Sequence, residues 1–432
     1  MSKDKQIAFF FGAGAEDIFG MPLGAQYTLD TILSERSQMT EALRRFYKNK
    51  INDYSSSYVG RSLFSKNSHT FREIVHRAAN ILRESNSDVD EDSQKVIELS
   101  LFDSDDKYAK EAFFNKVATV FDYVYIDIDK PHALNKRPKH IDIDDAPTKY
   151  LSLIRNFSYY GSIEKDFSAI INPKEAGNYR FWRLINYFWS AFFSIILPVL
   201  NLSSKYRNNK DYNKNCYEYI LQNLCEIVEY IYSDSFGKEI ELIYKNSYYY
   251  ILGQAFNNSR AITTNYTPFL EISEFEKPIY LAGRLSEFEI PEELRIVDIR
   301  NNEIPYKKII FPYMATQAPL KPIIDSVQLR EYVEFVKVLD SVDTLVLVGY
   351  NLNENDNHIN ALLRSFLVAD PNRRIVFCKY LNKNEFFNEV EIVNNIASKL
   401  KLRTAETKTQ IMVVPNYGCP NKLLSELKGR LL

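Results

Sequence analysis

The segment of residues 7–24, IAFFFGAGAEDIFGMPLG, most constrains the fold of this chain. Its first five residues, Ile7 to Phe11, are apolar and suit a strand that is covered on both faces. Gly12 and Gly14 follow, and glycines permit backbone conformations and close approaches that a side chain would block. Such a strand and glycine turn can bring backbone amides to a pyrophosphate. The same pattern also occurs as a plain tight turn, so both interpretations remain open.

A helix is expected to follow this turn. From Ala25 onward, Leu29, Ile32 and Leu33 have helical spacing. The N-terminus of such a helix would point at the ligand, where unpaired amides and the helix dipole favour an anion. Of the two acidic residues after the glycine turn, Glu16 and Asp17, we expect at least one to point away from a bound phosphate, because like charges repel.

Short β-rich runs alternate with helical segments after Arg260. The runs are AITT (261–264), PIYLA (278–282), KKIIFP (307–312), TLVLVGY (344–350), RRIVFCKY (373–380) and QIMVVP (410–415), with helices expected at 325–341 and 355–368. This alternation predicts an α/β fold with a doubly wound, parallel, Rossmann-like sheet. Ligands of such sheets bind beyond the carboxyl ends of the strands. The loops at Gly12, Asn265, Gly283 and Gly349 should therefore converge on one crevice.

The stretch 38–255 is expected to be a large, mainly helical insertion domain. Glycine is scarce there, and apolar and aromatic residues recur every three or four positions, as in 71–82 and 217–232. Polar, turn-rich stretches are expected to be loops: 84–93, 130–149 and 203–215. The predicted division is a nucleotide-binding domain of 1–37 and 256–432, interrupted by an insertion that serves regulation or oligomerisation.

Charge and hydropathy restrict the partners and the compartment. The net charge is −2, with 54 basic and 56 acidic residues, so nothing global indicates binding to nucleic acid or an anionic membrane, and a local nucleic-acid contact stays open. The segment 181–200 is strongly apolar but contains Arg183, Asn186 and Pro198, and we expect a buried helix there and no membrane association. Four scattered cysteines favour a reduced, cytoplasmic protein and lack the paired spacing of a zinc site.

Three later segments follow the glycine loop in a characteristic order: AITTNYTPFLE (261–271), KPIYLAGRLSE (277–287) and TLVLVGYNLNENDNHINALLRSF (344–366). Together with that loop they resemble the sirtuin-like fold. The likeness covers about 15–35 and 260–420, and it is nearer to the bacterial sirtuin-like NAD hydrolases of phage defence than to the protein deacylases. Deacylases of this family usually carry a zinc ribbon, and we expect no zinc here.

The resemblance implies roles for individual residues. Asn265 would be catalytic, beside the nicotinamide ribose, although turn statistics alone make it a turn residue. The residues implied in binding NAD are Gly12, Ala13, Gly14, Ala15, Glu16, Thr264, Gly283, Gly349 and Asn351. Thr267 stands where the family has an acidic residue, which is a departure from its pattern. Thr316 and Gln317 resemble a further family loop, with a packing or turn role as the alternative.

Ala282 is the most consequential departure from the family pattern. It occupies the position of the family's catalytic histidine, and alanine cannot transfer a proton. Either the natural protein uses another base or none, or the alanine is an inactivating replacement introduced to trap a ligand; the good match around it favours the second. His358 is a candidate substitute base, with a surface or capping role as its alternative. Asp356 is expected to cap the helix that begins at Asn357.

By resemblance, the chain is expected to be an NAD+ hydrolase that releases nicotinamide and ADP-ribose as an abortive-infection effector. Relatives of this kind are activated by a sensor, such as an ATPase translocase, a short Argonaute or a nucleotide-sensing subunit, or by self-assembly. The resemblance therefore implies a homo-oligomer with a separate sensor protein. The alternative is a non-catalytic module that binds NAD or ADP-ribose, in which Ala282 is natural. Protein deacylation would require the zinc ribbon that the sequence lacks.

Overall fold

A computed structural model shows two compact units, one of residues 1–21, 231–285 and 314–432, and one of 22–230 and 286–313. Within them the structure describes residues 6–19, 21, 77–83, 94, 97–98, 100–102, 104–115, 117, 195, 199–200, 210–301, 304, 308–313, 326–353, 356–381, 385–403 and 405–431. Each unit is considered by itself below.

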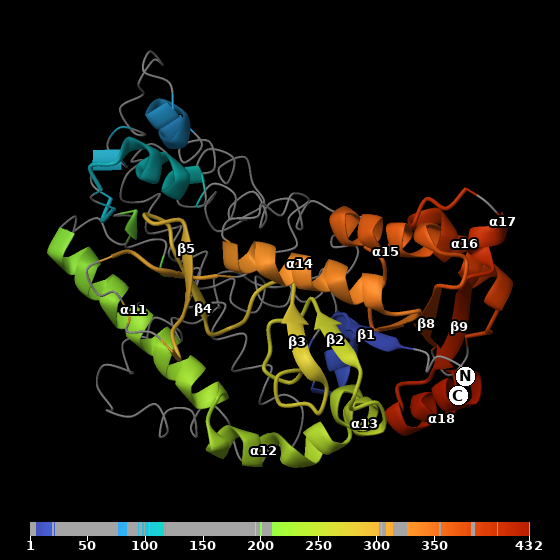
Figure 1. Cartoon of the computed structure of the whole chain (residues 1–432). Coiled ribbons are helices and arrows are strands. Elements are labelled where there is room, and N and C mark those ends of the chain that lie inside the picture. Colours follow the sequence, from blue (N-terminus) through green and yellow to red (C-terminus); the bar gives the residue numbers. More distant parts are fainter. Residues whose placement is uncertain are drawn as a thin grey trace, which may run out of the picture. The chain divides into compact units, whose positions relative to one another are not determined.

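The first unit contains a six-stranded parallel sheet, with strand order β3-β2-β1-β7-β8-β9. The strands are β1 (Ile7–Phe11), β2 (Arg260–Thr263), β3 (Glu276–Tyr280), β7 (Thr344–Val348), β8 (Arg374–Tyr380) and β9 (Ile411–Asn416). The order runs outward from β1 to β3 on one side and from β7 to β9 on the other, as in Rossmann-type sheets. The predicted α/β fold with a doubly wound parallel sheet is confirmed (Figure 1).

Helices cover both faces of this sheet, and strand β1 shows how the alternation of side chains produces the layers. Phe10 points toward α14 (Ser326–Ser341) and packs on Phe335, with ring centroids 5.7 Å apart. On that face α15 (Asn357–Ala369) and α16 (Glu389–Lys399) complete one hydrophobic core. Phe9 points the other way and packs on Phe256 and Phe275, at 5.1 Å and 5.2 Å.

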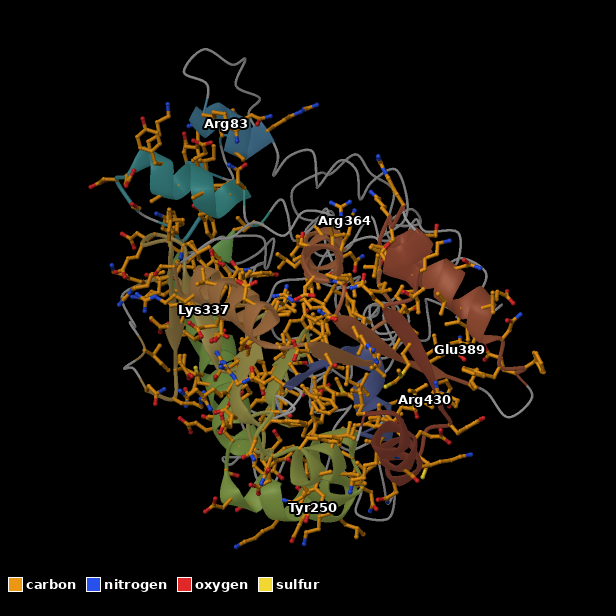
Figure 2. The ribbon with its side chains drawn as sticks, turned by 45° about the vertical axis from the view of Figure 1, so that its right-hand side comes forward. Arg83, Tyr250, Lys337, Arg364, Glu389 and Arg430 are labelled. Atoms are coloured by element: carbon orange, nitrogen blue, oxygen red, sulfur yellow. The ribbon has the colours of Figure 1, made fainter. Side chains whose placement is uncertain are left out.

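The opposite layer is built from α13 (Tyr248–Ala255) and α18 (Pro420–Leu431), which contact each other, with α12 (Asp234–Lys245) beside α13 (Figure 1). Helix α13 begins at the N-cap Ser247, whose side chain accepts a hydrogen bond from the amide of Tyr250. At the β9 edge of the sheet, Arg430 of α18 reaches Glu389 of α16 at 3.8 Å (Figure 2). Helices of this unit thus pack on both faces of the sheet.

The second unit contains a three-stranded antiparallel sheet of order β5-β4-β6. Its strands are β4 (Glu287–Ile290), β5 (Arg295–Asp298) and β6 (Phe311–Pro312), and the long helix α11 (Lys210–Ile231) begins in the same unit. Tyr217 of α11 receives a hydrogen bond from the amide of Ile310 at 2.7 Å. Burial raises the pKa of the Cys225 thiol, also on α11, to about 12, so this thiol stays protonated and unreactive near neutral pH.

Most of the secondary structure expected after Arg260 is confirmed. The helices predicted at 325–341 and 355–368 are α14 and α15, and five of the six predicted β-rich runs lie in the parallel sheet. The sixth, KKIIFP, was expected among the parallel strands, but its strand β6 pairs antiparallel with β4 in the other unit.

The predicted helix at 217–232 is α11, which begins at Lys210 and so extends into the stretch 203–215 expected to be a loop. Helices α12 and α13, expected in the 38–255 insertion, belong to the unit of the parallel sheet. The helix from Ala25, the loops at 84–93 and 130–149, Thr316 and Gln317 lie outside the described residues. Most of the segment 181–200 also lies outside them. The described part of the helix predicted at 71–82, residues 77–82, is helical. The insertion domain as a whole stays a prediction. None of the described helices has an apolar stretch long enough to cross a membrane.

Candidate functional site

The candidate site lies where β1, β2, β3 and β7 end. Phe11 pairs with Thr263 on one side and with Val348 on the other, and Thr263 pairs with Tyr280. Because these strands are parallel and end in register, the loops after them begin at the same edge of the sheet. The four strand ends thus lie at one edge, and the crevice expected between their loops stays a prediction. Between β1 and β7 the strand order reverses, which is where doubly wound sheets bind ligands.

The glycine loop after β1 is tied to the loop after β7. The amide of Gly12 donates to the carbonyl of Val348 at 2.9 Å, and that of Gly14 donates to Gly349 at 2.9 Å. A Cβ atom on Gly12 would lie 2.7 Å from the Gly349 carbonyl oxygen. Gly349 has φ +68°, and a Cβ there would lie 2.2 Å from the Ala15 nitrogen. These glycines are thus required for the approach of two loops, independently of a ligand.

The amides of this loop are mostly engaged within the protein. In addition to Gly12 and Gly14, Ala15 donates its amide hydrogen to the Gly12 carbonyl at 2.9 Å. Ala13 begins a 3-10 helix, η1 (Ala13–Phe19), in place of an extended loop. In this conformation the amides of Gly12, Gly14 and Ala15 are not available to a pyrophosphate. Contact between the loop and NAD stays a prediction.

Asn265, two residues beyond the end of β2, is held by the surrounding backbone and is 7% exposed. Its Nδ2 atom donates to the Gly12 carbonyl at 3.0 Å and to the Tyr249 hydroxyl at 2.9 Å. The backbone amide of Asn265 donates a hydrogen bond to Thr263 Oγ1 at 2.9 Å. The Thr263 hydroxyl in turn donates to the Phe11 carbonyl at 3.1 Å. The predicted catalytic asparagine and the predicted glycine loop are therefore in direct contact. The preceding Thr264 is bonded through its backbone, with its amide hydrogen on the Phe11 carbonyl at 3.2 Å.

Glu16, Tyr249, Asn265 and Thr267 form a hydrogen-bonded cluster. Glu16 is its charged group and is 3% exposed. Its Oε1 atom accepts a hydrogen bond from the Tyr249 hydroxyl at 3.0 Å and another from the Thr267 hydroxyl. Burial raises the pKa of Glu16 from 4.5 to about 7, and hydrogen bonds from Thr267, Tyr249 and Asn265 oppose that rise. Asp17 is exposed, and the expectation that one of the two acidic residues points away from a bound phosphate stays a prediction.

Two members of this cluster were not assigned such a role by the sequence. Tyr249 lies on α13, in a run of three tyrosines that resembles any buried helix face, and no sequence signal separates it from Tyr248 or Tyr250. Thr267 was noted only as a departure from the family pattern. In the structure the Thr267 hydroxyl donates a hydrogen bond to the Glu16 carboxyl. A carboxyl group therefore lies beside position 267, although it comes from Glu16 and not from residue 267.

Ala282 is buried at 4% exposure, in the turn that follows β3. Gly283 has φ +90°, a conformation that favours glycine, and brings the chain back toward α14. There Arg284 pairs with Glu331 at 3.0 Å, and its guanidinium lies over the Tyr280 ring at 4.4 Å from the centroid. The structure shows no proton-transferring group at position 282 itself.

The loop after β7 places Tyr350 inside and Asn351 outside. The Tyr350 hydroxyl donates to Asn360 Oδ1 at 3.1 Å, whereas Asn351 is exposed and its carbonyl accepts from Lys399 at 2.8 Å. Asn351 thus contacts Lys399 of α16. Its predicted contact with the adenosine ribose stays a prediction.

The alternative base, His358, lies in the first turn of α15. Its Nε2 atom is 2.8 Å from the Tyr332 hydroxyl of α14, so the ring is held between two helices. Asp356 is the N-cap residue of α15, as expected, but its side chain makes no capping hydrogen bond. The charge of Asp356 adds to burial in raising the pKa of Tyr266, the residue after Asn265, above its usual range. Asp356 therefore acts electrostatically on the β2 loop.

The described residues contain no group of three or more histidine, cysteine or acidic side chains that could hold a metal ion. Comparisons with protein-family models and with curated proteins find no match to this sequence. The assignment of function therefore depends on the fold and on the geometry at the strand ends.

Proposed function

We propose that this protein is an NAD+ hydrolase that releases nicotinamide and ADP-ribose. The observation that carries the proposal is the position of Asn265: it is bonded to the glycine loop at the reversal of strand order in a Rossmann-type sheet. Sheets of this order bind dinucleotides at that point. Fold alone does not define function, so the chemistry of the cluster provides the second part of the support.

In the proposed reaction, the bond between the ribose anomeric carbon and the nicotinamide nitrogen breaks, and the electron pair leaves with nicotinamide. The carbon then has oxocarbenium character and is attacked by water, which loses a proton. The Asn265 amide would orient a ribose hydroxyl or the water, and positioning of this kind provides large rate factors. The buried Glu16 carboxyl would add negative charge near the developing cation.

Proton transfer is the step that this chain does not visibly provide. Ala282 has no group that accepts a proton, and histidine at that position would supply one. The proposal therefore includes a disabled state of this chain, in which NAD binds but is hydrolysed slowly or not at all. The role in defence against phage, the cytoplasmic location, the homo-oligomer and the sensor partner extend the proposal from the sequence resemblance.

The second candidate is a module that binds NAD or ADP-ribose without hydrolysis. The buried alanine at position 282 favours it, because that position carries no group that accepts a proton. In this case ligand occupancy would regulate assembly, and restoring a base would release no nicotinamide.

The test is nicotinamide release from NAD by the parent chain and by Ala282→His, each with and without the product of a neighbouring gene. We expect Ala282→His to release nicotinamide and Asn265→Ala in that background to lose the activity. Asn258→Ala, a change of an exposed asparagine in the turn before β2, should keep it. If no variant releases nicotinamide although NAD binds, the binding module is supported. If NAD does not bind, both proposals are contradicted.

A further inference from the structure

The side chain of Asn265 is oriented by a chain of hydrogen bonds that begins at Glu16. The Tyr249 hydroxyl donates to Glu16 Oε1 at 3.0 Å and accepts from Asn265 Nδ2 at 2.9 Å. The same Nδ2 atom donates to the Gly12 carbonyl at 3.0 Å. The amide nitrogen is therefore committed to the protein, and no described residue donates to Asn265 Oδ1.

The direction of each hydrogen bond follows from the chemistry of its two ends. An ionised carboxylate and a backbone carbonyl only accept, so the Tyr249 hydrogen points to Glu16, and an Asn265 hydrogen points to Gly12. A hydroxyl has one hydrogen, and once it is given to Glu16 the Tyr249 oxygen can only accept. Asn265 must then present Nδ2 to Tyr249 and its Oδ1 to the opposite side.

Protonation of Glu16 weakens this constraint. A neutral carboxyl is a weaker acceptor, and it can itself donate to Tyr249. If it donates, the Tyr249 hydrogen is released toward Asn265, and the orientation of the amide is no longer enforced from that side. Glu16 is surrounded by the groups that decide its charge: the titratable hydroxyls of Tyr249 and Tyr280, the Thr267 hydroxyl and the Asn265 amide. Tyr280 is itself fixed, because its hydroxyl donates to the Thr267 carbonyl at 3.1 Å.

We propose that Glu16 is a positioning residue whose carboxylate, acting through Tyr249, holds Asn265 with its Oδ1 atom directed to a ligand as a hydrogen-bond acceptor. The ligand group that this acceptor recognises is a hydroxyl, as on a ribose, or a water molecule. The Gly12 carbonyl holds Asn265 Nδ2 at either pH, and the ionised carboxylate adds the constraint from the Tyr249 side. The site should therefore bind its ligand more tightly above the pH at which Glu16 titrates than below it. This inference rests on the proposed function for the identity of the ligand, and on the contacts of Glu16 for the orientation.

Burial of Glu16 brings the titration of its carboxyl close to neutral pH. The pKa of Glu16 lies near 7, so its charge changes across neutral pH, where that of an exposed glutamate does not. A ligand that prefers the ionised form must lower the pKa of Glu16 on binding, and protons are then released into the buffer near neutral pH. Such release is a signature that a purely structural role of Glu16 does not produce.

The first experiment is calorimetric titration of the parent chain with ADP-ribose at about pH 6 and about pH 8, on either side of the Glu16 titration. Buffers of different ionisation enthalpy report the protons released. We expect tighter binding at the higher pH, with proton release near neutral pH. Glu16→Gln should weaken binding at high pH by about tenfold, the loss of one charge-assisted hydrogen bond, and should abolish the proton release. Asp17→Asn, which removes the neighbouring exposed charge, should retain both.

The second experiment reports Glu16 without a ligand. Infrared difference spectra across neutral pH should contain the carbonyl stretch of a protonated carboxyl that Glu16→Gln lacks. In Tyr249→Phe this band should persist to higher pH, because the carboxylate has lost a donor. Tyr249→Phe keeps the ring and its packing on Phe11 at 4.8 Å, so it also covers the case in which Glu16→Gln does not fold.

The outcomes separate the inference from the proposed function. Binding of ADP-ribose that does not depend on pH, or that is equal in Glu16→Gln and the parent, overturns the positioning role while the proposed function stands. Failure of the parent to bind ADP-ribose or NAD contradicts the proposed function, and the infrared titration then decides the inference. A carboxyl band that is unchanged in Tyr249→Phe overturns the coupling between Glu16 and Tyr249.

Discussion

Replacement of Glu16 by glutamine should change how the stability of the protein depends on pH. In the folded chain the pKa of Glu16 is raised from 4.5 to about 7, chiefly by burial. The folded state therefore binds a proton more tightly than the unfolded state does. The stabilisation that this proton gives is fully present below pH 4.5 and is lost as the pH rises through about 7. Glutamine does not titrate, so the variant should lack this component.

The size of the effect follows from the shift. Each unit of pKa difference corresponds to about 1.4 kcal/mol, and a shift from 4.5 to about 7 gives about 3 kcal/mol. Between about pH 5 and about pH 8 the parent should lose most of this amount relative to Glu16→Gln. All other groups titrate in both proteins, so their contributions cancel in the comparison.

The assay is urea unfolding of the parent, Glu16→Gln and Asp17→Asn across this pH range, followed by circular dichroism. We expect the difference in unfolding free energy between the parent and Glu16→Gln to grow with pH, in favour of the variant. Asp17→Asn should run parallel to the parent, because Asp17 is exposed. Parallel curves for the parent and Glu16→Gln would refute the reasoning, since they would mean that Glu16 titrates normally in the folded chain.

Two further pairs of substitutions test the packing of the glycine loops and the charge pair at α14. Gly349→Ala should destabilise the protein by about 3 kcal/mol, because a Cβ there would lie 2.2 Å from the Ala15 nitrogen at φ +68°. Gly429→Ala in α18, where nothing lies within 4 Å of a new Cβ, should stabilise it by about 0.5–1 kcal/mol in the same urea-unfolding assay. Glu331→Gln should cost about 1–2 kcal/mol by removing the charge paired with Arg284 at 3.0 Å, whereas Glu334→Gln on the exposed face of α14 should change stability by less than about 0.5 kcal/mol. Equal effects of the two changes in either pair would contradict these assignments.

The parallel sheet could be predicted because its strands are buried on both faces and therefore appear as continuous apolar runs. The run TLVLV of β7, for example, is buried at every position. The same criterion failed for KKIIFP, since a short apolar run does not specify which strand it pairs with or in which direction. The strand contributes only Phe311 and Pro312, and its partner β4 was not among the predicted β-rich runs.

The site was predicted in part. A glycine turn and an asparagine after apolar runs mark strand ends, and parallel strands bring such ends together. The sequence could not show that Gly12 and Gly349 pack on each other, because that contact joins segments more than 300 residues apart. Nor could it identify Tyr249, whose role depends on which face of α13 meets Glu16.

The binding site itself can be tested most directly by a crystal structure of the parent chain with ADP-ribose. We expect the ligand at the carboxyl ends of β1 and β7, with a ribose hydroxyl within hydrogen-bonding distance of Asn265 Oδ1. Ligand density elsewhere in the molecule, or a ligand that leaves Asn265 without contact, would contradict the assignment of this site.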